Sequence, residues 1–302
     1  MMAARIAVLS LMGAALVVSL ASHALAAWVG RRAAAPAFLT RDCRGRAGRA
    51  RCLLRGLLTS LGSQFVTGLL YPLGPLAGWL AHRSCRRRSG PTVVCLHGLY
   101  HNPAAFLALR PALARRGLRR VLCPGYLSFG TDFERVAQKL LAGLRAGPPG
   151  PLLFVGHSLG GVLARRVMAE PDIARRTLAA VTLGSPHGGS ALAVCAPGRL
   201  GRALAPGGPI VMAVEALPDP PGAALLSLAS PADNMVAPLT GLCIGRPGWR
   251  EEATPAVSHV AMLYHPAVIA RAADFLARAV SERPANPAAG PVSVADVTAS
   301  GL

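Results

Sequence analysis

Lysine is almost absent from the sequence: Lys139 is the single one, and all other basic residues are arginines. Only 13 acidic residues stand against 32 basic ones, so the formal net charge is +19. Such a charge would suit a nucleic acid, but no aromatic-interleaved basic patch or nucleic-acid motif accompanies it. Abundant arginine, alanine, glycine and proline together indicate a compositional bias. We therefore expect no nucleic-acid partner, and an anionic membrane surface accounts for the excess charge more economically.

Metal-binding patterns are missing as well. The seven cysteines include no C-x-x-C pair, no H-E-x-x-H occurs, and an odd number of cysteines does not form a disulfide framework. Cys95 and Cys123 fall in or at the end of apolar runs and are expected to pack in the core. With 302 residues, 52% of them apolar and 15% charged, the chain is expected to form one ordinary domain with an extension and no metal site.

The N-terminal region contains a long uncharged stretch, Ile6–Gly30. Its 25 residues could span a hydrocarbon core of ~30 Å as a helix. The same region has the parts of a secretory signal, since an A-L-A cleavage box ends at Ala26. Arg31 and Arg32 follow at once and disfavour clean translocation. We therefore expect residues 1–32 to be a retained membrane anchor, with export after cleavage near Ala26 as the alternative.

Residues 33–90 form a basic and apolar linker to the rest of the chain. Eight arginines lie between Arg31 and Arg55, and the positive-inside rule would leave the following domain in the cytoplasm, although the general abundance of arginine weakens that inference. The uncharged residues 56–81 are interrupted by P-L-G-P at 72–75. They predict a second, kinked span, a segment lying on a membrane surface, or an element packed on the main domain.

A strand-to-helix junction, F-V-G-H-S-L-G-G at Phe154–Gly161, is the most informative motif. The apolar run before it predicts a buried parallel strand, and the residues after it have apolar positions spaced for a helix. In G-x-S-x-G the serine lies on a sharp turn without room for side chains two residues away, which accounts for Gly156 and Gly160. The pattern predicts that Ser158 is a nucleophile and that the N–H of Leu159 stabilises the oxyanion.

Such a nucleophile needs a second oxyanion donor and a general base. An apolar strand breaks at His97 and Gly98, so the N–H of Leu99 is the predicted donor, while the His97 side chain is expected to brace the loop. The base should come last in the chain. His259 lies in a loop before the final predicted helix and is preferred over His265, which begins that helix.

The acid should lie between the nucleophile and the base, after a strand. Asp233 directly follows the predicted strand at 223–229 and is the preferred acid. Asp219 lies among prolines before that strand, and Asp172 lies in a helix–strand connection at the other edge. Together with the base, Ser158 and Asp233 form the predicted catalytic triad.

Strand-like and helix-like segments alternate along residues 91–281. Strands are predicted at 92–96, 120–123, 152–155, 178–183, 223–229 and 242–244. Helices are predicted near 103–116, from a T-D-F-E capping box at 131–134, at 161–170 and at 265–281. This order implies a mostly parallel sheet with helices on both faces and a site at the carboxyl ends of the strands. The Pro/Ala/Gly-rich residues 282–302 predict a disordered tail.

Over residues 91–281 the chain resembles the α/β-hydrolase family, and within it the bacterial lipases and esterases. The resemblance rests on L-H-G-L at 96–99, G-H-S-L-G-G at 156–161, L-G-S-P-H-G-G-S at 183–190, the S-x-x-D that ends at Asp233, and S-H-V-A-M-L at 258–263. It implies an α/β-hydrolase fold without an organic cofactor, a short cap over residues 191–222 and a structural role for His187. Some bacterial lipases have a disulfide between comparable regions, so by resemblance Cys195 and Cys243 could pair.

The resemblance also implies a function: a serine hydrolase that cleaves carboxylic, lipidic esters through an acyl-enzyme on Ser158. Two other functions stay open, an acyltransferase that uses the same triad and a non-catalytic membrane protein that keeps the fold. We expect a lipid or small acyl-ester substrate and a membrane as partners. Removing residues 1–32 should weaken membrane attachment and leave the triad untouched.

Overall fold

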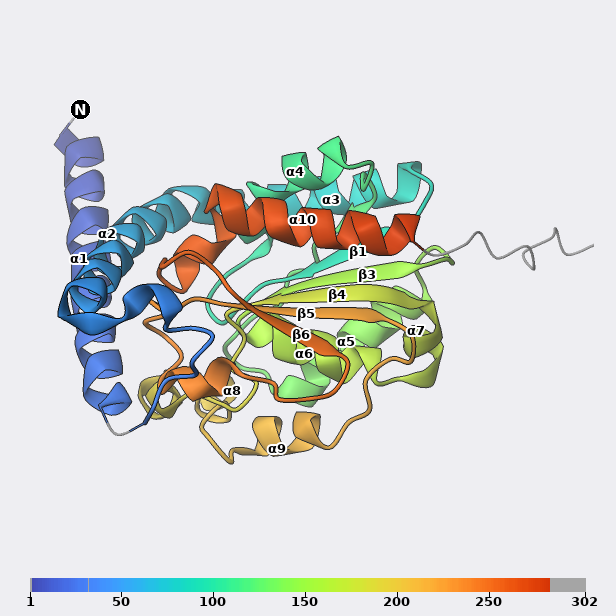
Figure 1. The fold of residues 1–302 in the computed structure, drawn as a ribbon. Coiled ribbons are helices and arrows are strands. Elements are labelled where there is room, and N and C mark those ends of the chain that lie inside the picture. Colours follow the sequence, from blue (N-terminus) through green and yellow to red (C-terminus); the bar gives the residue numbers. More distant parts are fainter. Residues whose placement is uncertain (1, 32, 283–302) are drawn as a thin grey trace, which may run out of the picture.

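A six-stranded sheet forms the centre of the computed structural model, which describes residues 2–31 and 33–282 (Figure 1). The strands are β1 (Thr92–Leu96), β2 (Val121–Leu122), β3 (Leu152–His157), β4 (Thr177–Leu183), β5 (Ala224–Ala229) and β6 (Trp249–Ala253). Their order in the sheet is β2-β1-β3-β4-β5-β6, and every neighbouring pair is parallel. The parallel sheet predicted from the alternation of segments is therefore confirmed. Of the expected tail at 282–302, all but the first residue lies outside the described residues.

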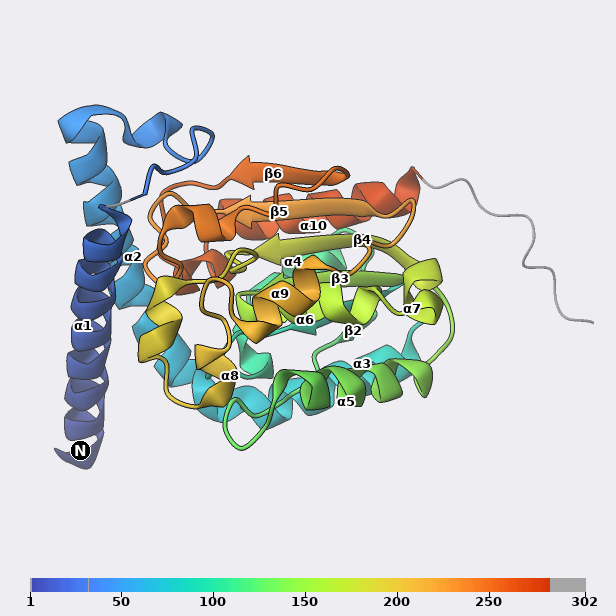
Figure 2. The same cartoon turned by 90° about the horizontal axis from the view of Figure 1, so that it is seen from below.

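Helices cover both faces of this sheet, and Figure 2 shows one of these faces from below. The upper face in Figure 1 is covered by α4 (Leu109–Arg115) and α10 (Pro266–Ser281). The lower face is covered by α5 (Phe133–Arg145) and α6 (Leu159–Met168), with α9 (Pro209–Glu215) packed on α6. Two short helices, α7 (Pro171–Arg176) and α8 (Arg199–Arg202), lie in the connections. This is the two-sided architecture that the sequence predicts.

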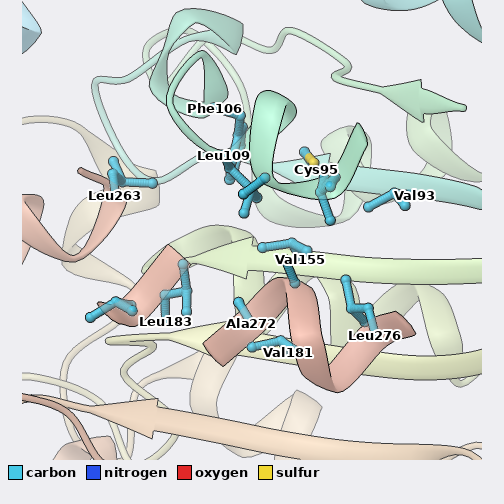
Figure 3. Close-up of a cluster of buried hydrophobic side chains, with 14 of the residues drawn as sticks. Val93, Cys95, Phe106, Leu109, Val155, Val181, Leu183, Leu263, Ala272 and Leu276 are labelled. Carbon is cyan, nitrogen blue, oxygen red and sulfur yellow. The ribbon is translucent and has the colours of Figure 1, made fainter. Parts of the chain in front are cut away.

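The strands bury apolar side chains on both faces because successive side chains of a strand point to opposite sides. Val93 and Cys95 of β1 and Val155 of β3 join one core with α4 and α10, which Figure 3 shows in close-up. Val94 and Phe154 join the other core with α5 and α6. Full burial of one such side chain stabilises the fold by about 1.5–3 kcal/mol. These two cores hold the strand ends, and hence the loops that follow them, in fixed positions.

Two predicted boundaries are wrong. The last strand is β6, not residues 242–244, and Leu242 instead ends a 3₁₀ turn. This strand, W-R-E-E-A, pairs only with β5 at the sheet edge and is partly exposed, so it lacks the apolar run that marks a buried strand. The capping box is also displaced by one residue: Asp132 is the N-cap of α5, and its Oδ1 accepts from the N–H of Arg135 at 2.7 Å.

The disulfide in the structure differs from the one that the resemblance suggested. Cys43 and Cys52 form a disulfide, whereas Cys195 and Cys243 are free thiols. The pairing suggested for Cys195 and Cys243 is therefore wrong. Cys95 is buried in the core as expected, and so is Cys123.

Three helices precede the sheet: α1 (Met2–Gly30), α2 (Gly45–Leu70) and α3 (Gly74–Arg87). Among the described helices, α1 is the one long and apolar enough to cross a membrane, and little of it is buried. A 3₁₀ turn at Tyr71–Leu73 separates α2 from α3, and α3 packs on β2 with Ala81 in the core. For residues 56–81 this packing favours an element of the main domain over a second span. Figures 1 and 2 show α1 and α2 side by side at one end of the molecule.

Candidate active site

Ser158 lies at the tip of a strained turn between β3 and α6. Its φ of 55° and ψ of −125° are rare for a residue with a side chain, and its N–H donates to the carbonyl of Leu183 at 2.9 Å. The flanking glycines are sterically required. A Cβ on Gly160 would lie 1.9 Å from the Leu96 carbonyl oxygen, and one on Gly156 would lie 2.4 Å from the backbone of α6. The sequence motif thus folds as the sharp strand-to-helix turn expected of it.

The loop after β1 lies directly against this serine. A Cβ on Gly98 would come within 2.9 Å of the Ser158 Cβ. Leu159 is the first residue of α6, so its N–H has no acceptor within the helix. The N–H of Leu99 makes no hydrogen bond to any residue that the structure describes. Both predicted donor amides therefore lie beside Ser158 with their N–H groups available for an oxyanion.

Asp233 and His259 form a buried pair. Nδ1 of His259 and Oδ2 of Asp233 are 2.7 Å apart, and both residues are almost fully buried. The other carboxylate oxygen of Asp233 accepts from the N–H groups of Met235 and Val236, each at 2.9 Å. Because Nδ1 is used in the pair, Nε2 is the ring nitrogen of His259 that can act as a base.

A histidine next to the serine connects the two halves of the site. The ring of His157 lies 4.8 Å from the ring of His259, centroid to centroid, and its Nε2–H donates to the His259 carbonyl at 3.1 Å. His157 directly precedes Ser158 at the end of β3, whereas Asp233 follows β5 and His259 follows β6. The three predicted residues therefore come from the carboxyl ends of three strands and gather at one edge of the sheet.

The rival candidates have other partners. Asp219 forms an ion pair with Arg246, with Nε and Oδ2 3.2 Å apart. The Asp172 carboxylate binds Arg145 at 2.9 Å on the surface at the other end of the sheet. His265 is the residue before α10. Within the described part of the chain, none of these side chains contacts the Asp233 pair.

Four further histidines have lowered pKa values; His97, His157 and His187 are buried, and His101 is partly buried. Burial lowers the pKa of His97 to about 4 and that of His187 to about 3. Burial also lowers the pKa of His101 to about 3, with the positive charges that His97 and His259 could carry as smaller causes. The pKa of His157 is well below its ordinary value, first because of burial. His97 braces its loop as expected, since Nδ1–H donates to the Gly98 carbonyl at 2.9 Å.

His187 occupies the core behind the site. Its Nε2 is 3.1 Å from the Thr182 hydroxyl, and its ring lies 5.8 Å from that of Trp249. These contacts join the loop after β4 to β6 and fit the structural role that the resemblance implies.

A cavity of about 1000 Å³ opens beside the loop that carries Leu99. Its wall includes Tyr100 and His101, and His101 lies 5.8 Å from His157, ring centroid to ring centroid. The remaining wall is mostly apolar and comes from α3, α5 and residues 122–129. Exposed apolar side chains lie on the same elements, among them Tyr71, Leu73, Leu76, Trp79, Leu127 and Phe129.

Two residues beside the site were not predicted. His101 belongs to no sequence motif, and only the folding of its loop brings its ring close to that of His157. Asn234 was also missed, although its place directly after the predicted acid could have marked it. Its amide oxygen accepts from the N–H of His259 at 3.1 Å, and its Nδ2 donates to the hydroxyl of Ser22 in α1 at 2.6 Å. Residue Ser22 of α1 is therefore bonded to the loop that carries the predicted acid, so the effect of removing residues 1–32 on the triad stays a prediction to be tested.

Known proteins share this fold. The family model described as "Alpha/beta hydrolase family" matches residues 93–296. Among solved structures, the lipase BlEst2 of Bacillus licheniformis is similar with a TM-score of 0.47 and 16% identity, over 58% of this chain and 86% of that one. Est1E of Butyrivibrio proteoclasticus, with bound ferulic acid, is similar with a TM-score of 0.47 and 13% identity, over 64% and 91% of the two chains.

A third similar structure is the phospholipase PlaB of Legionella pneumophila, with a TM-score of 0.40 and 18% identity over 47% of this chain and 40% of that one. At these identities the likeness concerns the fold alone. Among curated proteins, no sequence matches this chain.

Proposed function

The chain belongs to the alpha/beta hydrolase family, and from this premise we propose that it is a membrane-associated serine hydrolase that cleaves lipidic carboxylic esters. The observation that carries the proposal is that a strained serine and a buried Asp–His pair lie close together at one edge of the sheet. Ser158 occupies a strained turn, and the buried pair of Asp233 and His259 lies next to it through His157. A scaffold protein has no use for a strained serine and a buried carboxylate–imidazole pair in this order.

In the proposed mechanism, Ser158 Oγ attacks the acyl carbonyl carbon while Nε2 of His259 takes the hydroxyl proton. Asp233 holds the imidazole ring through Nδ1 and stabilises its positive charge. The carbonyl oxygen becomes an oxyanion and is stabilised by the N–H groups of Leu99 and Leu159. The intermediate collapses to the acyl-enzyme, and His259 gives its proton to the leaving alcohol. Water then repeats the same steps and releases the acid.

The cavity supports a lipidic substrate. Its volume of about 1000 Å³ and its mostly apolar wall suit a long acyl chain. Its wall includes Tyr100 and His101, the two residues that follow the proposed donor Leu99, so the cavity adjoins the loop that lies against Ser158.

The arrangement of apolar side chains supports association with a membrane. Only 17% of the candidate span Val8–Gly30 is buried, so most of its residues remain at least partly exposed. Further exposed leucines follow on α2, and exposed aromatic residues surround the cavity, including Trp79 and Phe129. A bilayer would cover these surfaces together.

The function is tested by labelling with a fluorophosphonate and by hydrolysis of acyl esters of graded chain length. We expect Ser158→Ala to abolish labelling and to lower kcat by about 10⁴-fold or more, because only binding and the oxyanion donors would remain. Ser281→Ala, an exposed serine at the end of α10, is the matched control. Activity should rise with acyl length. A Ser158→Ala variant with more than a tenth of the parent activity would overturn the proposal.

Membrane association is tested separately by carbonate extraction of full-length protein. We expect the protein to stay with the membrane pellet, since about 20 apolar residues in hydrocarbon hold a protein firmly. Full recovery of the active protein in the supernatant would contradict the anchor.

A further inference from the structure

The helix that would anchor the protein has one polar stripe. Ser19, Ser22 and His23 lie three and four positions apart, so they share one face of α1. Ser19 and His23 are almost fully buried, although most of the helix is exposed. The polar stripe therefore points into the protein while the apolar faces point outward, which is the reverse of a helix in a water-soluble domain.

This stripe contacts the loop that carries the catalytic acid. The Ser22 hydroxyl donates to the Ser19 carbonyl at 3.2 Å and accepts from Nδ2 of Asn234 at 2.6 Å. The His23 ring lies where α2 and the acid loop meet, since a Cβ on Gly56 would be 2.9 Å from His23 Nε2 and 3.2 Å from the Ala232 Cβ. One turn of α1 thus bonds Asn234, the residue after Asp233, and lies near Ala232, the residue before it.

Asn234 connects α1 to the proposed base His259 through two hydrogen bonds. Its side chain is buried, Oδ1 accepts from the His259 N–H at 3.1 Å, and Nδ2 points to Ser22 and to the Ser60 hydroxyl at 3.5 Å. Its neighbour Asp233 binds the ring of the same histidine. The two adjacent residues therefore hold His259 at two points, the carboxylate at the ring and the amide at the backbone.

Helix α2 holds the segment around the base from the other side. The Thr59 hydroxyl accepts from the Ser258 N–H at 2.9 Å. Thr67 and the Tyr264 hydroxyl are 3.0 Å apart, and α2 packs on the 3₁₀ turn that follows His259. Helix α2 therefore bonds the segment on both sides of the base, through the Ser258 backbone before it and the Tyr264 side chain after it.

We propose that α1 and α2 form the support that positions His259, with Asn234 as the positioning residue, and that α1 is consequently retained in the active enzyme. The inference rests on the proposed function, because it assigns a role to the surroundings of the proposed base. Cleavage near Ala26 would remove Ser22 and leave a buried amide donor without its closest acceptor. A buried, unpaired donor is costly, so the acid loop and the base would shift to regain a partner.

Single substitutions in full-length protein, purified in lipid nanodiscs, test this proposal. Asn234→Ala should lower kcat and the rate of fluorophosphonate labelling by about 10²-fold with KM little changed, as expected for a misplaced base. Its melting temperature should fall, because the buried His259 N–H loses its acceptor. Ser22→Ala should lower both rates by about 3- to 10-fold, the effect of one lost hydrogen bond. Ser22→Thr, which keeps the hydroxyl, should restore them.

Ser10→Ala is the matched control, because Ser10 lies on the same helix and is exposed. If Ser158→Ala is inactive but Ser22→Ala has the same kcat and labelling rate as Ser10→Ala, the proposal of a support by α1 is overturned and the proposed function stands. If Ser158→Ala is active, the proposed function itself fails.

The intact mass of the labelled protein provides a second test. Protein that has reacted with the fluorophosphonate should contain residues 1–26. Labelled protein that begins at Ala27 would show that α1 is dispensable for the active state and would overturn the inference, while the labelling itself would still support the proposed function.

Discussion

The sheet domain buries apolar side chains, whereas the first N-terminal helix exposes most of its apolar side chains and buries polar ones. In the domain, apolar strand residues such as Phe154 are fully buried between helices, and most charged residues are at least partly exposed. In α1, apolar residues such as Leu9 are exposed, and the polar residues Ser19 and His23 are buried. The difference is the one that the proposed membrane association requires, with water around the first region and hydrocarbon around the second.

The two regions nevertheless meet at the catalytic loops. The domain supplies the reacting groups, whereas α1 and α2 supply hydrogen bonds to the segments that carry two of them. The following experiments compare substitutions or chemical changes in these two regions.

The largest effect should come from the catalytic groups of the domain. Asp233→Asn should lower kcat by about 10³- to 10⁴-fold with little change in KM, because the histidine loses the carboxylate that fixes its tautomer. Asp219→Asn should have a mild effect, since Asp219 pairs with Arg246 away from the site. Steady-state kinetics with one acyl ester measures both variants. An exchange of the two results would mean that the acid is Asp219.

Matched leucine truncations test this difference in burial directly. Leu163 in α6 is fully buried, whereas Leu9 in α1 is 67% exposed. Leu163→Ala should lower the free energy of unfolding by about 2–5 kcal/mol, because it leaves a cavity in the core. Leu9→Ala should leave the melting temperature of detergent-solubilised protein unchanged. Equal destabilisation by the two truncations would show that α1 is packed inside protein and not against lipid.

Acid should destabilise the domain through its buried histidines. The pKa values of His97, His101 and His187 are about 4, 3 and 3 in the folded protein, below the value of 6.5 that they have when exposed. Between these limits the unfolded chain binds more protons, so stability falls as the pH drops below 6.5. Each group contributes up to about 1.4 kcal/mol per pH unit.

Melting temperatures between pH 7.5 and 4.5 measure this dependence. His187→Gln should reduce the dependence of the melting temperature on pH by the contribution of one histidine. A melting temperature that is constant down to pH 4.5 would exclude buried neutral histidines.

The smallest effect concerns the disulfide between Cys43, just before α2, and Cys52 in α2. Thiol alkylation of unfolded protein should modify five cysteines before reduction and seven after it, because Cys43 and Cys52 are paired. A disulfide there favours an oxidising compartment, in contrast to the cytoplasmic side that the arginines between residues 31 and 55 suggest. Seven modified cysteines before reduction would favour the cytoplasmic side.

The sequence predicted the domain better than the helices before it. β1 was predicted to the residue and β3 to β5 within two, because buried parallel strands are continuous apolar runs bounded by glycine or polar residues. β6 was missed because an edge strand needs no such run. For the site, chain order and the strand ends selected Asp233 and His259, which the structure brings together.

Asn234 could not be predicted in the same way. Its role depends on Ser22 and Ser60, which are 212 and 174 residues away in the sequence. Nothing in the local pattern of α1 distinguishes a polar stripe that faces a partner from scattered serines in a signal segment. Only the packing of α1 and α2 on the acid loop separates these two interpretations.

The single lysine has a practical consequence. Lys139 lies on α5 in the wall of the large cavity and is exposed. Apart from the amino terminus, it is the one amine with which an acylating dye can react. A fluorophore attached there would need no engineered residue, and its emission would report directly when a long-chain compound enters the cavity.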